Sequence, residues 1–549
     1  MSLSLPSIPT SLLSPLSRPL IHVSRSSILS LFSRLTVGEL EIRTKDGNFR
    51  FGDPTLVKSK ERNHRTPAAE NGINGSKAHV NGNGVKKGGS AFAGAVPVNP
   101  LDAPRALLIV NSDNFWVRMF LGADLGFAES YMSGEVDTPD LGACFNLFIQ
   151  NRESLSNLQG FSFASSVFSS AQTLLNKRYA NTKIGSLKNI GAHYDISNAM
   201  YQAFLSKDMT YSCAVYEELD ADVTGPLLSS VRQEQRSENP DAATSNGHTN
   251  SASSGAFDNL RFNDPPVEGL ATEPEDELEA AQLRKLRLII KRANIRKGDR
   301  VLEIGTGWGS FAMEAVRMTG CKVDSLTLSV EQKALAEERI ALAGLSGSIT
   351  VHLMDYRDLP EKWNDKFDRL VSIEMLEAVG IEFLETYFRS VDRVLKRKGG
   401  AAVFQCITMP ESRFESYLNS VDFIRKWIFP GGVLPSVTSL VEGATKGSEG
   451  RLVLDTAVSI GPHYSRTLRE WRQRFEDNFD QIIAPALVRD HEEISKLDAE
   501  GQKREIEVFR KKWIYYFVYC EVGFTQRVIG DHILAFTREG NTTLPVCCG

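Results

Sequence analysis

The chain has 549 residues, 42% of them hydrophobic and 24% charged, with a formal net charge of −5 and a pI near 6.1. This length accommodates roughly two to four domains, and the acidic balance argues against a nucleic-acid binder, which normally presents a basic face. No apolar run approaches the roughly 18–20 residues of a membrane-spanning helix, and the seven cysteines show neither CxxC metal spacing nor the density of a disulfide framework.

The N-terminal end of the chain has the composition of a leader. Residues 1–38 contain no Asp or Glu, many Ser and three Arg, which is typical of transit peptides and also of disordered tails. We expect residues 1–27 to be disordered, and mitochondrial import stays open beside a cytoplasmic location. From Leu29 onward the pattern predicts a helix and then two alternating strands that turn at Asp46-Gly47.

Two segments are too polar to pack into a core. Residues 56–103 are rich in Gly, Asn and Lys, and residues 219–275 are rich in Ser, Asn and Asp. Because such segments cannot bury enough apolar surface to offset the entropy of ordering, both are predicted to be disordered insertions. The first lies in a small α+β N-terminal domain over 28–152, and the second lies in a catalytic domain over 186–549. A linker over 153–185 joins the two domains.

The catalytic domain alternates strand and helix patterns. An amphipathic helix is predicted over 278–295, followed by strands separated by helices, at 301–304, 322–328, 348–354, 368–375 and 401–407. This alternation predicts an α/β fold with a doubly wound, parallel sheet. Ligands of such sheets bind at the carboxyl ends of the strands.

The first of these strands runs into a glycine turn, VLEIGTGWGSF over 301–311. Three glycines lie two residues apart and follow an acidic residue: Glu303, Gly305, Gly307 and Gly309. A dinucleotide fold would place its third glycine where this chain has Ser310. The spacing resembles that of S-adenosylmethionine sites and argues against an NAD-linked oxidoreductase.

The next two strand ends carry groups suited to adenosine. Thr327 and Gln332 follow the second strand and are expected to contact the ribose. Asp355 and Tyr356 follow the third strand, and they offer a carboxylate and an aromatic plane for the adenine. Asp324 lies about where a dinucleotide fold keeps its ribose carboxylate, but it precedes the predicted strand end.

Seven segments resemble, in chain order, the cyclopropane fatty acid synthase family. They are HYDISNAMYQAFLSKDMTYSCAVY (193–216), LEIGTGWGSF, SLTLSVEQ, MDYRDLP, FDRLVSIEMLEAVG (367–380), WIFPGGVLPS (427–436) and YYFVYCEVGF (515–524). The resemblance covers essentially all of 104–549 outside the second insertion. The stretches Leu29–Gly52 and Phe120–Arg152 also resemble the extra N-terminal domain of the longer members.

The resemblance implies a Rossmann-like enzyme that depends on S-adenosylmethionine. Such an enzyme adds a methylene to the cis double bond of an unsaturated acyl chain, within a phospholipid, through a carbocation that bicarbonate deprotonates. Carried over by motif, the implied bicarbonate cage consists of Cys213 through its backbone, Glu377, Gln405, Ile407 and Tyr516. Tyr194 and Phe429 are implied to line the substrate and stabilise the cation, and Tyr211 to face the sulfonium cofactor. This chemistry needs no metal.

Two residues depart from the pattern of many bacterial members, which carry His at the positions of Gln405 and Ala378. Gln can donate a hydrogen bond to an anion, but it cannot relay a proton as His does. Glu374, at a position that is often small in bacterial members, is a candidate either for moving the proton or for a structural salt bridge.

Without a spanning segment, such an enzyme would contact the membrane peripherally and draw one phospholipid acyl chain into a tunnel. The N-terminal domain is a candidate for docking or for forming a homodimer. Two other functions stay open. One is methylation of a lipid or polyketide alkene to give a methylene or methyl branch, and the other is non-catalytic binding of a lipid or cofactor.

Overall fold

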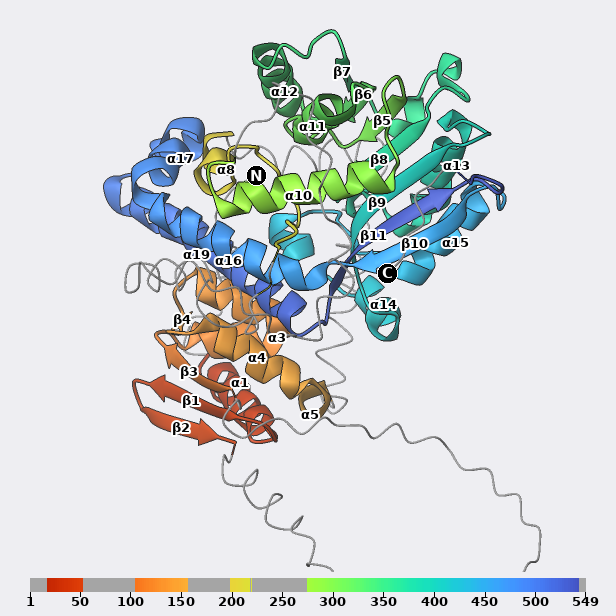
Figure 1. Ribbon diagram of the computed structural model, residues 1–549. Helices are drawn as coiled ribbons and strands as arrows, with labels where there is room; N and C mark the ends of the chain where they lie inside the picture. The colour runs from red at the N-terminus through yellow and green to blue at the C-terminus, as the bar shows by residue number, and fades with distance from the viewer. Residues whose placement is uncertain (1–16, 53–103, 157–197, 218, 220–273, 543–549) are drawn as a thin grey trace, which may run out of the picture.

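The computed structural model describes residues 17–52, 104–156, 198–217, 219 and 274–542 (Figure 1). The predicted insertion over 56–103 lies outside these residues, as do nearly all of the predicted insertion over 219–275 and the predicted linker beyond residue 156. Tyr194, which the resemblance assigns to the substrate site, lies outside them as well. In the described part of the chain, no helix combines the length and the apolar character of a membrane span.

The N-terminal domain is a small four-stranded sheet packed against helices. Its strands, in the order β2-β1-β3-β4, are β1 Glu39–Thr44, β2 Gly47–Phe51, β3 Arg105–Val110 and β4 Val136–Asp137. The predicted hairpin is confirmed, since β1 and β2 are antiparallel with Thr44 opposite Gly47, whereas β1 and β3 are parallel. The helices are α1 Ser17–Phe32, α3 Asn114–Met132, α4 Leu141–Gln150 and α5 Arg152–Ser156.

Helix α1 begins at Ser17, so the prediction that the leader is disordered is wrong for residues 17–27. Ser24, Ile28 and Phe32 recur every four residues and are buried, and this side of α1 packs on α3. An amphipathic helix needs only such a stripe of buried residues. Composition alone indicated a leader because α1 is rich in Ser, carries Arg and has no acidic residue, as leaders do.

The catalytic domain is built on a seven-stranded sheet in the order β10-β11-β9-β8-β5-β6-β7. The strands are β5 Arg300–Ile304, β6 Lys322–Thr327, β7 Ile349–Leu353, β8 Arg369–Ile373, β9 Ala401–Thr408, β10 Val453–Ser459 and β11 Gly530–Thr537. The five predicted strands, β5 to β9, are present and run parallel to one another. The sheet is not parallel throughout, because β11 runs antiparallel to both β9 and β10. The predicted α/β, Rossmann-like class is confirmed, with an antiparallel edge that the alternating pattern did not predict.

Helices cover both faces of this sheet, and alternate strand residues enter two different cores. Val301 and Val403 belong to one core, whereas their neighbours Leu302 and Ala402 belong to the other. Because successive side chains of a strand point to opposite faces, strands that are buried on both sides are apolar at nearly every position. The helices around the sheet are α10 Glu277–Arg292, α11 Ser310–Thr319, α12 Val330–Leu342, α13 Leu384–Val394 and α15 Val437–Gly447.

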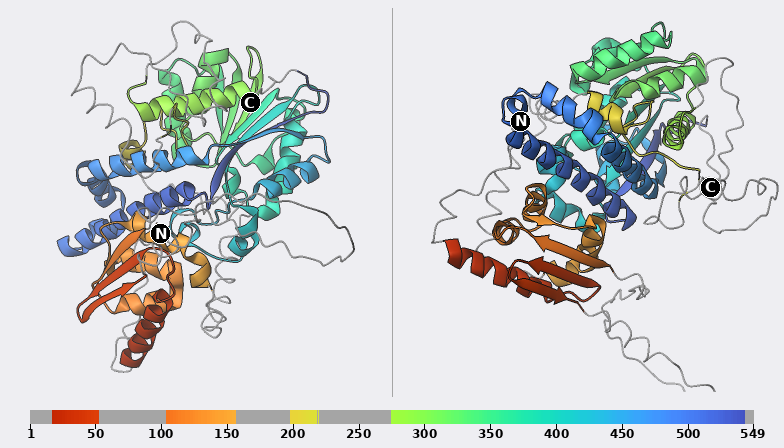
Figure 2. Two further views of the ribbon diagram at one scale, coloured as in Figure 1. Left: turned by 60° about the horizontal axis from the view of Figure 1, so that its bottom comes forward. Right: turned by 90° about the vertical axis from the view of Figure 1, so that its left-hand side faces the viewer.

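Two long helices, α16 Gly461–Asp477 and α19 Ala499–Thr525, lie between the sheet and the N-terminal domain (Figure 1, Figure 2). They pack against each other, α16 contacts β11, and α19 contacts α3 and α4. Tyr515 of α19 lies at the domain contact, with its ring centroid 5.0 Å from that of Phe145 and 4.5 Å from that of Phe423. The remaining described α-helices are α8 Asn198–Phe204, α14 Glu411–Leu418, α17 Ala484–Asp490 and α18 Glu492–Ser495.

Replacing Tyr515 with Ala is expected to lower the free energy of unfolding by about 3–5 kcal/mol, the usual cost of truncating a large buried aromatic side chain. Tyr515 is only 2% exposed, so the missing ring would leave a void between the domains. Tyr515→Phe is the matched control, because it keeps the ring and should cost much less. Chemical denaturation measures both variants, and equal losses would contradict the assignment of the stabilisation to ring packing.

Candidate active site

The carboxyl ends of the central strands surround a pocket of about 210 Å³, here called the strand-end pocket. It is lined by all the residues assigned above to the cofactor except Gly309, namely Tyr211, Glu303, Gly305, Gly307, Thr327, Gln332, Asp355 and Tyr356. This is the edge at which doubly wound sheets bind their ligands. The structure therefore brings the predicted cofactor residues from separate strand ends to one place.

The glycine turn has a backbone that requires glycine. Gly305 has a φ of +104° and Gly307 a φ of +51°, both outside the range that most side chains accept. The amides of Gly305 and Thr306 each donate to the carbonyl of Leu326 at 3.0 Å, which ties the turn to β6. Gly309 has a different part: it is the N-cap of α11, and a Cβ there would contact Ala336 of α12.

The segment that follows α8 is held against the glycine turn. Trp308 Nε1 donates to Asn198 Oδ1 at 3.0 Å. Arg339 of α12 donates to the carbonyl of Trp308 at 2.6 Å and to that of Asp208 at 2.9 Å. These bonds fix the stretch that carries Tyr211 beside the strand-end pocket.

Glu303 is a buried acid rather than an exposed charge. It is 3% exposed, and its carboxylate accepts a hydrogen bond from Ser325 Oγ. Burial raises the pKa of Glu303 to about 8, because the ionised form loses its hydration. At neutral pH this side chain therefore holds its proton.

The groups expected to contact adenosine are oriented by bonds among themselves. Thr327 Oγ1 donates to Gln332 Oε1 at 2.9 Å, which positions the amide at the pocket wall. Asp355 Oδ1 accepts from both the backbone N and Nε of Arg357 at 2.8 Å. The same guanidinium lies 5.3 Å from the centroid of the Tyr356 ring. Asp355 and Tyr356 thus form one unit with Arg357, a residue not assigned to the site from the sequence.

A much larger cavity of about 1030 Å³, here called the interdomain cavity, lies between the two domains. Helices α1, α3 and α4 line it on one side, and α14, α16, α19 and residues 429–434 line it on the other. Its walls are rich in apolar and aromatic side chains, such as those of Phe32, Phe127, Phe148, Leu468 and Phe524. A cavity of this kind suits a long apolar ligand.

The two cavities meet, since Tyr211, Glu374 and Ala378 line both. Tyr211 Oη lies 3.1 Å from Tyr516 Oη. The ring of Phe429 is 6.4 Å from that of Tyr211 and 6.1 Å from that of Tyr516, measured between centroids. Three aromatic rings from distant parts of the chain thus surround the junction. Such rings stabilise a nearby cation by roughly 0.5–2 kcal/mol.

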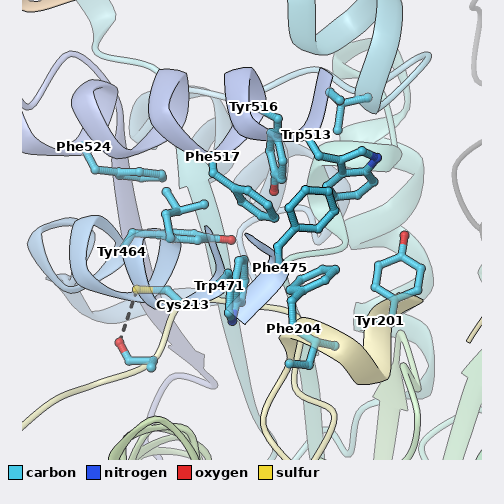
Figure 3. Packing of buried hydrophobic residues seen from close by; sticks show 14 of the residues in the cluster. Tyr201, Phe204, Cys213, Tyr464, Trp471, Phe475, Trp513, Tyr516, Phe517 and Phe524 are labelled. Atoms are coloured by element: carbon cyan, nitrogen blue, oxygen red, sulfur yellow. Dashed lines mark hydrogen bonds between the residues drawn. The ribbon is translucent and has the colours of Figure 1, made fainter. Parts of the chain in front are cut away.

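Close packing behind the junction holds these rings in place (Figure 3). Trp471 of α16 and Trp513 of α19 lie in a buried aromatic cluster with residues of α8. The ring of Trp471 is 5.1 Å from that of Tyr211, and the ring of Trp513 is 5.4 Å from that of Tyr516. The positions of the Tyr211 and Tyr516 rings therefore depend on how α8, α16 and α19 pack.

Cys213 contributes its backbone to the site. Its thiol is buried and donates to a backbone carbonyl (Figure 3), and burial raises the pKa of this thiol well above its usual value. The neutral thiol is not a nucleophile at ordinary pH. The backbone N–H of Cys213 instead donates to Glu374 Oε1 at 2.8 Å.

Three of the donors that the resemblance assigns to bicarbonate are bonded to carboxylates of the chain itself. Cys213 N and Gln405 Nε2 both donate to Glu374 Oε1 at 2.8 Å. The backbone N of Ile407 donates to Glu377 Oε1 at 2.6 Å. The hydroxyl of Tyr516, the remaining donor of the predicted cage, instead lies 3.1 Å from that of Tyr211. Cys213, Glu377, Gln405 and Ile407 do come together as predicted, but their three N–H donors are already taken by the chain's own carboxylates and do not fit an additional bicarbonate.

Three further side chains complete the site, and the sequence did not single them out. Tyr464 of α16 donates to Glu374 Oε2 at 2.7 Å, and Gln405 Nε2 donates to Asp531 Oδ2 at 2.8 Å. Lys285 of α10 is fully buried and donates to Ser212 Oγ. Asp531 lies in the antiparallel strand β11, so its position beside β9 could not be inferred from the alternating pattern.

Comparison with known proteins identifies related sequences. The profile of the mycolic acid cyclopropane synthetase family matches residues 181–229 and 269–532. The chain is 30% identical, over 83% of its length and 87% of the relative, to a tuberculostearic acid methyltransferase of Mycobacterium tuberculosis. It is 28% identical to the cyclopropane-fatty-acyl-phospholipid synthase of Escherichia coli K12, over 79% of this chain and 88% of that one.

Solved structures that this chain is similar to include a mycolic acid cyclopropane synthase crystallised with SAH and CTAB. The superposition covers 64% of this chain and 97% of that one, with a TM-score of 0.45 and 23% sequence identity. A coclaurine N-methyltransferase bound to N-methylheliamine and SAH matches with a TM-score of 0.49 and 16% identity, over 75% and 98% of the two chains.

Replacing Gly307 with Val is expected to weaken S-adenosylmethionine binding at least tenfold, because a β-branched side chain strains a positive φ and intrudes on the strand-end pocket. Isothermal titration calorimetry measures the affinity. Gly344→Val is the matched control, since Gly344 also has a positive φ and open space but does not line this pocket. Unchanged affinity in Gly307→Val would contradict the assignment of the turn.

Replacing Glu303 with Gln is expected to remove a pH-dependent loss of stability. The folded protein keeps the Glu303 proton up to a pKa of about 8, whereas the unfolded chain loses it near pH 4.5. Wild-type stability should therefore fall between these pH values, and the variant should gain a few kcal/mol relative to wild type across that range. Denaturation of the ligand-free proteins at pH 5, 6.5 and 8 measures this difference. A difference that does not change with pH would refute the prediction.

Proposed function

The chain belongs to the mycolic acid cyclopropane synthetase family, and we propose that it forms cyclopropane rings on unsaturated acyl chains, using S-adenosylmethionine as the donor. The observation that carries the proposal is the junction of the two cavities at Tyr211, Glu374 and Ala378. A small pocket for the donor there shares its wall with a large apolar cavity for the acceptor.

When bound, S-adenosylmethionine supplies an electrophilic methyl group. The chain's own residues must then hold the double bond at the junction, stabilise positive charge and exclude water. Tyr211, Phe429 and Tyr516 provide aromatic faces for the cation. The apolar walls of the interdomain cavity limit the water that would trap it.

The expected base, bicarbonate, does not fit this donor set, because Glu374 and Glu377 accept the hydrogen bonds of Cys213, Gln405 and Ile407. No step of the proposed mechanism therefore depends on it. Burial, followed by the charge of Glu374, raises the pKa of Glu377 to about 8, so Glu377 holds a proton at neutral pH.

We infer that the acceptor is an acyl chain of a phospholipid and that contact with the membrane is peripheral. The interdomain cavity is lined in part by α1 and α3, and Leu121 of α3 is both part of this lining and 45% exposed. A large cavity with mostly apolar walls suits the binding of one acyl chain drawn from a lipid surface. The N-terminal domain thus contributes to the acceptor site itself, whether or not it also forms a homodimer.

A second outcome of the same chemistry is a methylene or methyl branch. It is favoured by the relative that is 30% identical, which is named a tuberculostearic acid methyltransferase. The two outcomes share the transfer to the double bond and differ in what the carbocation does next. Loss of a proton from the added methyl closes the ring, whereas a hydride shift to the cationic carbon before that loss gives a methylene branch. A saturated methyl branch requires a separate hydride donor as well.

Expression in a bacterium that lacks its own cyclopropane synthase tests the proposal. Mass spectrometry should show acyl chains heavier by one CH₂, and proton NMR should show upfield ring-methylene signals with loss of olefinic protons. Methylene or branched-methyl signals would instead support the second outcome. The matched control is Gly307→Val, which should give no new lipid. Unmodified lipids from a folded wild-type protein that binds S-adenosylmethionine would reject both forms of the proposal.

A further inference from the structure

Glu374 has an unusual backbone conformation at the junction of the two cavities. It directly follows β8, and its φ of +46° is rare for a residue other than glycine. Its backbone N donates to the carbonyl of Gln405 at 2.8 Å, which holds this conformation against the sheet. Strained backbone of this kind persists where the surrounding structure enforces it, often at functional sites.

The Glu374 carboxylate occupies the position expected for an anion. Oε1 accepts from Cys213 N and Gln405 Nε2, both at 2.8 Å, and Oε2 accepts from Tyr464 Oη at 2.7 Å. Two of these donors were expected to hold bicarbonate. A glutamate carboxylate presents the same pair of oxygens on one carbon, so the side chain replaces the anion in both shape and charge.

Hydrogen bonding distinguishes Glu374 from its acidic neighbour Asp531. Burial and then the charge of Glu374 raise the pKa of Asp531 well above its usual range, and Asp531 Oδ1 has no hydrogen-bond partner among the described residues. Burial raises the pKa of Glu374 as well, but three donated hydrogen bonds favour its charged form. The fully buried Lys285 lowers the energy of a negative charge in this cluster further.

Resting on the proposed function, we propose that Glu374 is the general base of the reaction and takes the place of bicarbonate. After the methyl group has joined the double bond, one of its C–H bonds breaks. The electron pair forms the second C–C bond of the ring, and the proton passes to a carboxylate oxygen of Glu374. The proton then leaves to solvent as the product is released. No oxidant, reductant or further ion is required.

The variant Glu374→Gly tests this assignment, because glycine accepts the positive φ and vacates the anion position without removing its donors. In buffer depleted of CO₂, wild-type activity should be unchanged, whereas the variant should lose at least 100-fold, since a general base contributes about 10²–10⁴ in rate. Added bicarbonate or formate should restore part of the variant's activity. Glu385→Gln, at an exposed residue of α13, controls for the loss of a carboxylate elsewhere.

Binding of ¹³C-bicarbonate, followed by NMR, gives a second measurement that does not depend on turnover. Bicarbonate should bind to Glu374→Gly and not to wild type, while both proteins keep their affinity for S-adenosylmethionine. A wild-type enzyme that loses activity without bicarbonate, or a variant as active as wild type, would overturn the assignment.

If wild type modifies no acyl chain at all, the proposed function fails and this inference falls with it. If wild type modifies acyl chains and Glu374→Gly is equally active, only the role of Glu374 is rejected.

Tyr464→Phe tests how the base is positioned. Loss of the hydrogen bond to Oε2 destabilises the ionised carboxylate and should raise the pKa of Glu374. The acidic limb of the pH–rate profile should therefore shift to higher pH in this variant. A lower rate without such a shift would show that Tyr464 acts only in packing.

Discussion

The hydrogen bonds to the Glu374 carboxylate are the interaction on which the site depends. A carboxylate removed from water is costly unless donors replace its hydration. The donors come from three separate parts of the fold: Cys213 after α8, Gln405 in β9 and Tyr464 in α16. Full hydrogen bonding of this one carboxylate therefore requires the sheet, the segment after α8 and helix α16 to be assembled correctly.

The same assembly creates two cavities of different size that share a wall. The strand-end pocket is formed by turns and strand ends, where backbone groups and polar side chains are available to a polar ligand. The interdomain cavity is formed by helix faces from both domains, and its lining is largely apolar. The contact of α19 with α3 and α4 thus completes the larger cavity as well as holding the N-terminal domain.

Burial raises the pKa of every acid of the site. The pKa values of Glu303 and Glu377 rise to about 8, and those of Asp531 and Glu374 shift in the same direction. Glu374 receives more hydrogen bonds than any of the other three among the described residues. These donors favour its ionised form over those of its neighbours, and neutral acids beside it add no charge that would hold water in the cavity.

The sequence by itself determined the parallel core of the sheet, the glycine turn and the identity of most residues around the strand-end pocket. These features depend on local patterns: apolar runs, glycine spacing and the residues that follow each strand. Only the tertiary structure decided that Gly309 packs against α12 instead of lining the pocket, and that α1 begins at Ser17. It also decided that Asp531, Lys285 and Tyr464 join the site, because none of them belongs to a motif and their positions depend on how β11, α10 and α16 pack. The position of Glu374 among the predicted bicarbonate donors has the same cause. Its donors come from segments that lie far apart in the sequence, and no local pattern shows that these segments pack together.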